Sequence, residues 1–139
     1  MPREYRLLEH RSFRQQRIDF LSQFSGKERP LVERQLTDAL KKLLSDPFSA
    51  QTRPIRDLKT RKVQNITRRI YVGGNKRYRL IYLCPPNCNI LIPFYLSPDT
   101  RDYFDYDEHI EEIESLAVPI LDDYANRRYD QFFYWSDES

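Results

Sequence analysis

Arginine is the residue type whose pattern in this chain could do chemistry, and most of it lies in one basic segment. Between Arg53 and Arg79 the sequence has ten Lys or Arg and a single acid, Asp57. A guanidinium presents a planar fork of N–H donors that matches the oxygens of a phosphate in a bidentate manner. The segment therefore predicts a surface that attracts polyanions, with arginine as the phosphate ligand.

The spacing of these arginines decides which of them can act together. Side chains alternate between the two faces of a strand, so Arg77 and Arg79 share a face and could present two guanidiniums to one phosphate. On the preceding strand Arg69 shares a face with Tyr71, and Arg68 lies on the other. Because the sequence does not fix the register, either Arg68 or Arg69 could lie across from the Arg77/Arg79 row.

The acidic C-terminal third opposes the basic segment. Ten Asp or Glu and a single Arg, Arg101, lie between Asp99 and Asp123, although the net charge of the chain is only +2. The two blocks could pair with each other in the fold, which would leave no free basic surface. Negative charge beside a basic site would also repel RNA, so the acidic block could bind a basic partner or act as built-in inhibition.

Two amphipathic helices should precede the basic segment. Residues 5–9 are typical of a short first strand. Ser12 can cap a helix that Gly26 stops, and Pro30 suits the first turn of a second helix that ends at Asp46-Pro47. Each helix has one apolar side, so the pair predicts a helical hairpin that covers a sheet.

Three strands are expected after a loop over residues 47–62. Residues 63–72, 77–84 and 89–96 alternate or are strongly apolar, and the short turns between them force neighbouring strands to run antiparallel. Pro93 lacks an amide donor, so we expect a bulge or a locally open edge there.

A third helix and an aromatic tail should follow. Residues 110–124 place apolar side chains on one helical face, and Pro119 should kink or split this helix. Residues 129–135 could add a short strand or pack over the core. We expect residues 1–106 to form the core and residues 107–139 to extend the same domain. The predicted fold class is α+β, with a helical hairpin on a small antiparallel sheet and an extra C-terminal helix.

This order of elements resembles the RelE/ParE superfamily of toxins from bacterial type II toxin–antitoxin systems, in particular RelE/YoeB-like members. The strongest match is Thr67-Arg68-Arg69-Ile70 followed by Tyr78-Arg79-Leu80-Ile81-Tyr82, which is similar to the central hairpin of the family. Asp57-Leu58-Lys59 resembles the segment before that hairpin, and Thr100-Arg101-Asp102-Tyr103 resembles the ending of many members. The resemblance covers residues 5–106.

The resemblance implies an endoribonuclease that cleaves mRNA, usually on the ribosome, and so blocks translation. In that reaction a ribose 2′-OH attacks the adjacent phosphate without a metal, which requires a base, an acid and cations around the phosphorane. It implies catalytic roles for Arg79 and Arg101, and Tyr103 and Tyr106 are the candidates for the catalytic C-terminal tyrosine of the family. It implies RNA binding by Arg68, Arg69, Arg77, Lys59 and Lys62. The implied partners are a cognate antitoxin protein, mRNA and the ribosome.

The chain also departs from the family pattern in its acid–base residues. Some members use a Glu before the second strand, where this chain offers only Asp57, and some use a His after the last strand, where the nearest is His109. A tyrosine could be the base only beside arginines that favour its phenolate, and it could instead stack on an mRNA base. Arg101 could equally be a charge-balancing ion pair.

Two other functions therefore remain open beside the nuclease. One is a ParE-type inhibitor of DNA gyrase, and the other is a non-catalytic RelE-like binding protein. The sequence shows no signal peptide and no span apolar enough for a membrane, so we expect a cytoplasmic protein. It gives no sign of a cofactor or a metal site, and it does not determine the oligomeric state.

Overall fold

The computed structural model describes residues 5–56, 58–73, 77–97 and 106–135, with side chains from residue 109 onward in the last range. The elements are β1 (Arg6–His10), α1 (Arg11–Ser22), α2 (Glu28–Ser45), β2 (Thr52–Pro54), β3 (Thr67–Val72), β4 (Tyr78–Leu83), β5 (Ile90–Leu96), α3 (Tyr106–Ala125), a short 3-10 turn η1 (Tyr129–Gln131) and β6 (Phe132–Tyr134). No helix in these ranges has the length and apolarity needed to cross a bilayer.

The strands form one six-stranded sheet in the order β2-β3-β4-β5-β1-β6. The expected antiparallel meander is confirmed for β3, β4 and β5, but the prediction of a small, purely antiparallel sheet is wrong. β1 runs parallel to β5, and β2 and β6 extend the two edges. β1 takes an inner position because Leu7 and Leu8 point to opposite faces and are both buried, which requires cover on both sides.

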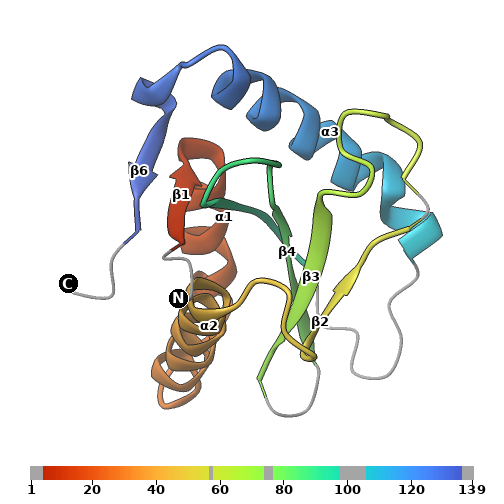
Figure 1. Ribbon diagram of the computed structural model, residues 1–139. Helices are drawn as coiled ribbons and strands as arrows, with labels where there is room; N and C mark the ends of the chain where they lie inside the picture. Colours follow the sequence, from red (N-terminus) through yellow and green to blue (C-terminus); the bar gives the residue numbers. More distant parts are fainter. Residues whose placement is uncertain (1–4, 57, 74–76, 98–105, 136–139) are drawn as a thin grey trace.

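The two faces of the sheet are covered by different helices (Figure 1). α1 and α2 pack on one face, where the core includes Phe13, Leu40 and Leu80. α3 packs on the other, where Ile113 lies in a cluster with Ile81. We call these the hairpin face and the α3 face. β4 lies between both layers, and all six of its residues are buried.

The helix boundaries follow local chemistry. The cap of α1 is His10 and not Ser12: the His10 ring accepts a hydrogen bond from the Ser12 amide, which has no partner within the helix. Pro30 lies in the first turn of α2, as expected. Pro119 does not split α3. Proline has no amide hydrogen, so the carbonyl one turn earlier lacks its helical donor. Pro119 lies on the exposed side of the helix, where water can donate to that carbonyl instead.

The bulge predicted at Pro93 is confirmed. Tyr82 pairs with Pro93 and Ile81 pairs with Tyr95, so Phe94 is the extra residue on β5. Gln16 of α1 forms two hydrogen bonds with the backbone of β5 at this bulge. Its side-chain amide nitrogen donates to the Phe94 carbonyl over 3.1 Å, and its side-chain oxygen accepts from the Leu96 amide over 2.6 Å. α1 thus continues the hydrogen bonding of β5 where β1 has ended.

Two consecutive residues at the end of β1 tie the helices to the sheet. Glu9 is 2 % exposed and accepts from the Nε and Nη2 of Arg17 in α1, over 2.8 and 3.0 Å. The next residue, His10, donates from Nε2 to Asp123 of α3 over 2.8 Å, because its Nδ1 accepts from Ser12. Asp123 also accepts from Arg128 over 2.9 Å. These bonds, that of His10 first, hold the pKa of Asp123 below its usual value.

Tyr82→Phe should lower the free energy of unfolding by about 1–2 kcal/mol, because the Pro47 carbonyl would lose its donor. The Tyr82 hydroxyl is fully buried and donates to that carbonyl over 2.6 Å, and burial raises its pKa to about 12. Urea unfolding measures the change, with Tyr134→Phe on the exposed edge as the control. Equal stabilities for wild type and Tyr82→Phe would show that this bond contributes nothing.

Asp123→Asn should destabilise the protein at neutral pH by about 1–2 kcal/mol, since a charged acceptor for two donors is lost. A carboxyl with a lowered pKa stabilises the fold above its unfolded pKa of about 4, and that contribution disappears as the pH falls through the lowered value. The stability gap between wild type and variant should therefore close below about pH 4. Thermal unfolding at neutral and acidic pH tests this, and a gap that does not depend on pH would contradict it.

Candidate functional site

Three arginines and a tyrosine meet on the α3 face of the sheet. Arg69 and Tyr71 alternate with the buried Ile70 of β3, which faces the hairpin side, so both point to the α3 face. The register sets Arg79 of β4 opposite Tyr71 and Arg53 of β2 opposite Arg69. Three neighbouring strands thus contribute one guanidinium each to the same patch, which we call the arginine face.

Tyr71 is the centre of the arginine face. The guanidinium carbon of Arg69 lies 4.3 Å from the centre of the Tyr71 ring, and that of Arg79 lies 5.1 Å from it. Cation–π attraction at these distances fixes the orientation of both guanidiniums. Arg53 is held differently, because its Nη1 donates to the backbone carbonyls of Ala50 and Thr52 over 2.7 and 2.8 Å.

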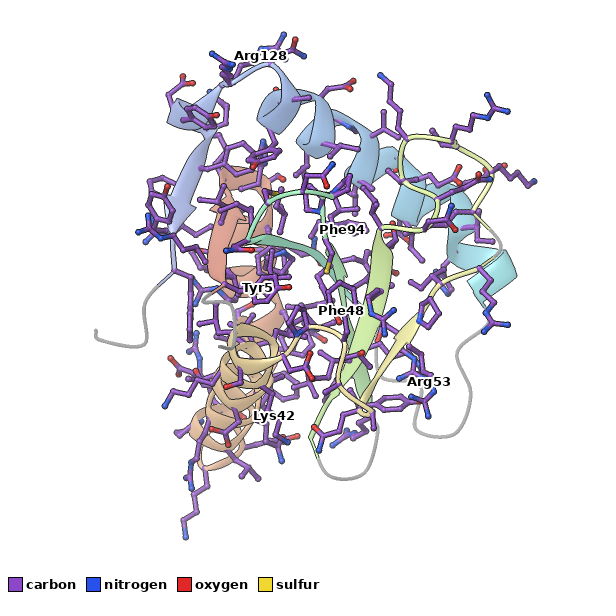
Figure 2. The ribbon with its side chains drawn as sticks, viewed as in Figure 1. Tyr5, Lys42, Phe48, Arg53, Phe94 and Arg128 are labelled. Atoms are coloured by element: carbon purple, nitrogen blue, oxygen red, sulfur yellow. The ribbon has the colours of Figure 1, made fainter. Side chains whose placement is uncertain are left out.

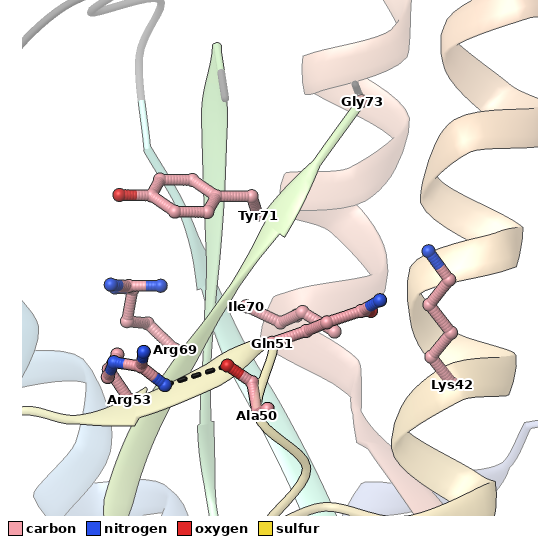
Figure 3. Close-up of a pocket in the computed structure, with 8 residues that line it drawn as sticks. All are labelled: Lys42, Ala50, Gln51, Arg53, Arg69, Ile70, Tyr71 and Gly73. Atoms are coloured by element: carbon pink, nitrogen blue, oxygen red, sulfur yellow. Dashed lines mark hydrogen bonds between the residues drawn. The ribbon is translucent and has the colours of Figure 1, made fainter. Parts of the chain in front are cut away.

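The arginine face opens into a hollow at the outer edge of β3. The hollow has a volume of about 420 Å³. Thr52, the first residue of β2, pairs with Ile70, so the last residues of β3 lack a neighbouring strand on this side. Figure 3 shows Arg53, Arg69 and Tyr71 on one side of the strands. Gln51, which precedes β2, and Lys42, in α2, lie on the other side. A ligand in this hollow would meet cations from both sides of the sheet edge.

Arg53 and Arg69 are the accessible cations of this surface. Arg53 is exposed and Arg69 is half-buried. Within the described ranges no ion pair joins either of them to a carboxylate. Arg79 is only 6 % exposed. Its backbone amide donates to the Ser97 hydroxyl over 2.8 Å, and its guanidinium reaches Tyr71. Arg79 is therefore placed to position Tyr71, while Arg53 and Arg69 are placed to contact a ligand.

A second polar group lies further along the α3 face. Tyr95 is opposite Ile81, which follows Arg79 by two residues, so Tyr95 and Arg79 are diagonal neighbours. Both the Tyr95 hydroxyl and His109 Nδ1 lie 3.4 Å from Glu112 Oε2. Burial, and then Glu112, raise the pKa of Tyr95, so its hydroxyl stays protonated as a donor. These residues line a further hollow of about 550 Å³.

The structure shows which of the candidate arginines lie on the same face of the sheet, a question that the sequence left open. Arg69 lies across from the row that contains Arg79, whereas Arg68 points to the hairpin face, where its Nη2 donates to Thr52 over 2.8 Å. Arg77 precedes β4, and its guanidinium lies 3.9 Å from Glu28 of α2. Neither Arg68 nor Arg77 is therefore part of the arginine face.

The two predicted lysines lie beside α3. Lys62 forms an ion pair with Asp122 over 3.1 Å, and Glu114 accepts from the amides of Lys59 and Thr60. Pairing between the basic and acidic blocks, one of the alternatives read from the sequence, thus occurs at this loop.

Three of the predicted catalytic residues lie where the structure describes no side chains. Arg101 and Tyr103 lie outside the described residues, and Tyr106 begins α3 at a position where only the backbone is described.

Several residues of the site are not among those predicted from the sequence. Arg53 belongs to the basic segment and falls in the predicted loop, whereas the structure places it in β2. A strand of three residues that includes Pro54 has little sequence signal. Lys42 and Gln51 come from other elements, and only the fold brings them to the hollow. Tyr71 could have been found, since it shares a strand face with Arg69 and precedes the Gly73 turn.

Comparisons with known proteins do not add to this description. No model of a protein family matches the chain, and no curated protein matches its sequence. In the described part of the chain, His, Cys, Asp and Glu side chains do not gather in a group of three that could hold a metal ion.

Arg53→Ala and Arg69→Ala should each weaken binding of a short single-stranded RNA about tenfold, since each would remove one phosphate contact. The slope of log affinity against log salt concentration should become shallower by about 0.7 for each. Arg34→Ala, on the exposed side of α2, is the control of equal charge. Fluorescence anisotropy over a salt series measures both quantities, and an unchanged slope would show that the arginine face does not contact phosphate.

Proposed function

We propose that the chain is a RelE/ParE-like toxin that cleaves mRNA, at the ribosome, and thereby blocks translation. The observation that carries the proposal is the arginine face, where guanidiniums from β2, β3 and β4 surround Tyr71. The order of elements supports it as well: a strand, two helices and an antiparallel meander follow one another as the resemblance implies. A cognate antitoxin is the corresponding protein partner.

The arginines would act on the phosphate that is attacked. Arg53 and Arg69 can each direct N–H donors to phosphate oxygens, and they are fixed before the RNA arrives. Cations that are already oriented stabilise the extra negative charge of a phosphorane without a cost of rearrangement. Tyr71 and Arg79 act as positioning residues in this scheme, because Tyr71 holds both guanidiniums and Arg79 is largely buried.

Proton transfer would use the group at the start of α3. His109 lies 3.4 Å from Glu112. This pairing of an imidazole with a carboxylate would provide the acid–base couple that the sequence pattern lacks. Glu112 orients the ring, and Tyr95 in turn donates to Glu112. His109 would exchange a proton with the 2′-OH or with the leaving 5′-oxygen while the arginines hold the phosphate between them.

Arg69→Ala should abolish growth arrest when the protein is produced in a bacterial host without an antitoxin, and should lower transcript cleavage about a hundredfold. His109→Asn should lower cleavage to a similar extent while leaving the affinity for RNA unchanged, because the imidazole moves protons and does not bind phosphate. Primer extension on cellular mRNA maps the cuts, and Arg34→Ala is the matched surface control.

The outcomes separate the three functions. Cut transcripts that disappear in Arg69→Ala support the nuclease. Growth arrest with intact transcripts and inhibited DNA supercoiling would replace the nuclease with a ParE-type gyrase inhibitor. No growth arrest from the folded wild-type protein would leave a non-catalytic binding protein.

A further inference from the structure

The opposite edge of the sheet carries an aromatic and basic surface that the proposed site does not use. β6 is the last strand of the sheet, and β2, which carries Arg53, is the first. On and beside β6 three aromatic side chains reach solvent: Tyr129 is 58 %, Phe133 42 % and Tyr134 67 % exposed. Large aromatic side chains at an edge strand are a liability for a soluble protein unless they bind something.

Two of these rings are stacked against arginines from other elements. The guanidinium carbon of Arg14 in α1 lies 4.3 Å from the centre of the Phe133 ring, and that of Arg6 in β1 lies 5.7 Å from the Tyr134 ring. The rings lie on opposite faces of β6, because neighbouring residues of a strand alternate. A guanidinium in contact with a ring keeps N–H donors that can bind a phosphate.

Further arginines surround these stacked pairs and outnumber the acids of this edge. Arg11 reaches Gln131 in the turn before β6, and Arg127 and Arg128 are exposed between α3 and β6. Glu9 is buried and pairs with Arg17 and, over 3.6 Å, with Arg14, and Asp123 is held between His10 and Arg128. Asp130 is exposed and bonds to Gln131. Arg6, Arg11, Arg14, Arg127 and Arg128 outnumber these three acids, so the charge of this edge is positive.

We propose that this edge, which we call the β6 surface, is a binding site for single-stranded RNA that is separate from the arginine face. Single-stranded nucleic acid is the ligand that pairs stackable bases with regularly spaced phosphates, and proteins bind it by interleaving aromatic rings with cations. An acidic peptide would match the arginines but not the exposed rings. Duplex RNA offers no free base faces. The proposal does not depend on the nuclease, because no residue is shared between the two surfaces.

The distance between the surfaces makes the site testable by itself. In Figure 2, Arg128, beside the β6 surface, lies at the top of the view, and Arg53, on the arginine face, lies at the lower right; β6 and β2 are the two outer strands of the sheet. The single tryptophan of the chain, Trp135, directly follows β6, and its amide donates to the Leu7 carbonyl over 3.0 Å. Its fluorescence therefore reports on ligands at β6 and not on ligands at Arg53.

The experiment titrates the full chain with a short single-stranded oligouridylate while the fluorescence of Trp135 is recorded. Saturable quenching is expected for the wild type and also for Arg69→Ala. Phe133→Leu and Tyr134→Leu keep apolar bulk but remove the stacking rings, and each should weaken the affinity about tenfold. Arg14→Lys keeps the charge but loses the planar stack, and should weaken it about threefold to tenfold. Leu31→Ala, at an exposed position of α2, is the control for an apolar surface change.

Each result decides the proposal. Quenching that is lost in Phe133→Leu and Tyr134→Leu but kept in Arg69→Ala and Leu31→Ala supports it, whether or not the protein cuts RNA. No quenching in the wild type, or quenching that is unchanged in Phe133→Leu and Tyr134→Leu, would overturn the β6 site. Equal quenching by duplex RNA or by polyglutamate would show a general polyanion or acidic-peptide surface, which also overturns it. Circular dichroism of each variant confirms that it is folded.

Discussion

The alternation of side chains at the end of β1 is the constraint on which the layered structure depends. Glu9 points to the hairpin face and bonds to Arg17, and His10 points to the α3 face and bonds to Asp123. A carboxylate as buried as Glu9 is tolerable only with a geometrically good cationic partner, and the two bonds from Arg17 supply one. One strand therefore fixes both helical layers, and β6 is added beside it.

This arrangement leaves the arginine face accessible. α3 packs over apolar residues of β4 and β5 such as Ile81 and Phe94, and it is held at its far end through Asp123. The side chains of Arg53 and Arg69, on the outer strands β2 and β3, stay at least partly in solvent. The same layers that build the core thus determine which part of the sheet can bind a ligand.

The sequence could predict the elements that depend on local patterns. The two helices, the antiparallel meander and the bulge at Pro93 follow from periodicity, turns and a missing amide, which act over a few residues. The parallel pairing of β1 with β5 joins residues more than half the chain apart, and no local pattern encodes it. The choice of Arg69 over Arg68 needs the register of β3 against β4, which only the folded turn provides.

Three acids of the C-terminal acidic block hold α3 in place. Glu114 bonds to the loop at Lys59 and Thr60, Asp122 to Lys62, and Asp123 to His10. These carboxylates hold α3 on the sheet, so their charge is directed to the loop and to β1 and not to the arginine face. In the described part of α3, Glu114, Asp122 and Asp123 therefore each have a structural partner.

The burial of Arg79 completes the physical argument for the arginine face. A guanidinium taken out of water costs free energy, and here its position against the Tyr71 ring is one of the contacts that offset the cost. The ring in turn orients Arg69, which is closer to solvent. Arg79, Tyr71 and Arg69 form a chain of contacts in which each group restricts the next. In the proposed nuclease, this chain of contacts would let Arg69 meet a phosphate without first losing conformational freedom, which is what stabilisation of a short-lived phosphorane requires.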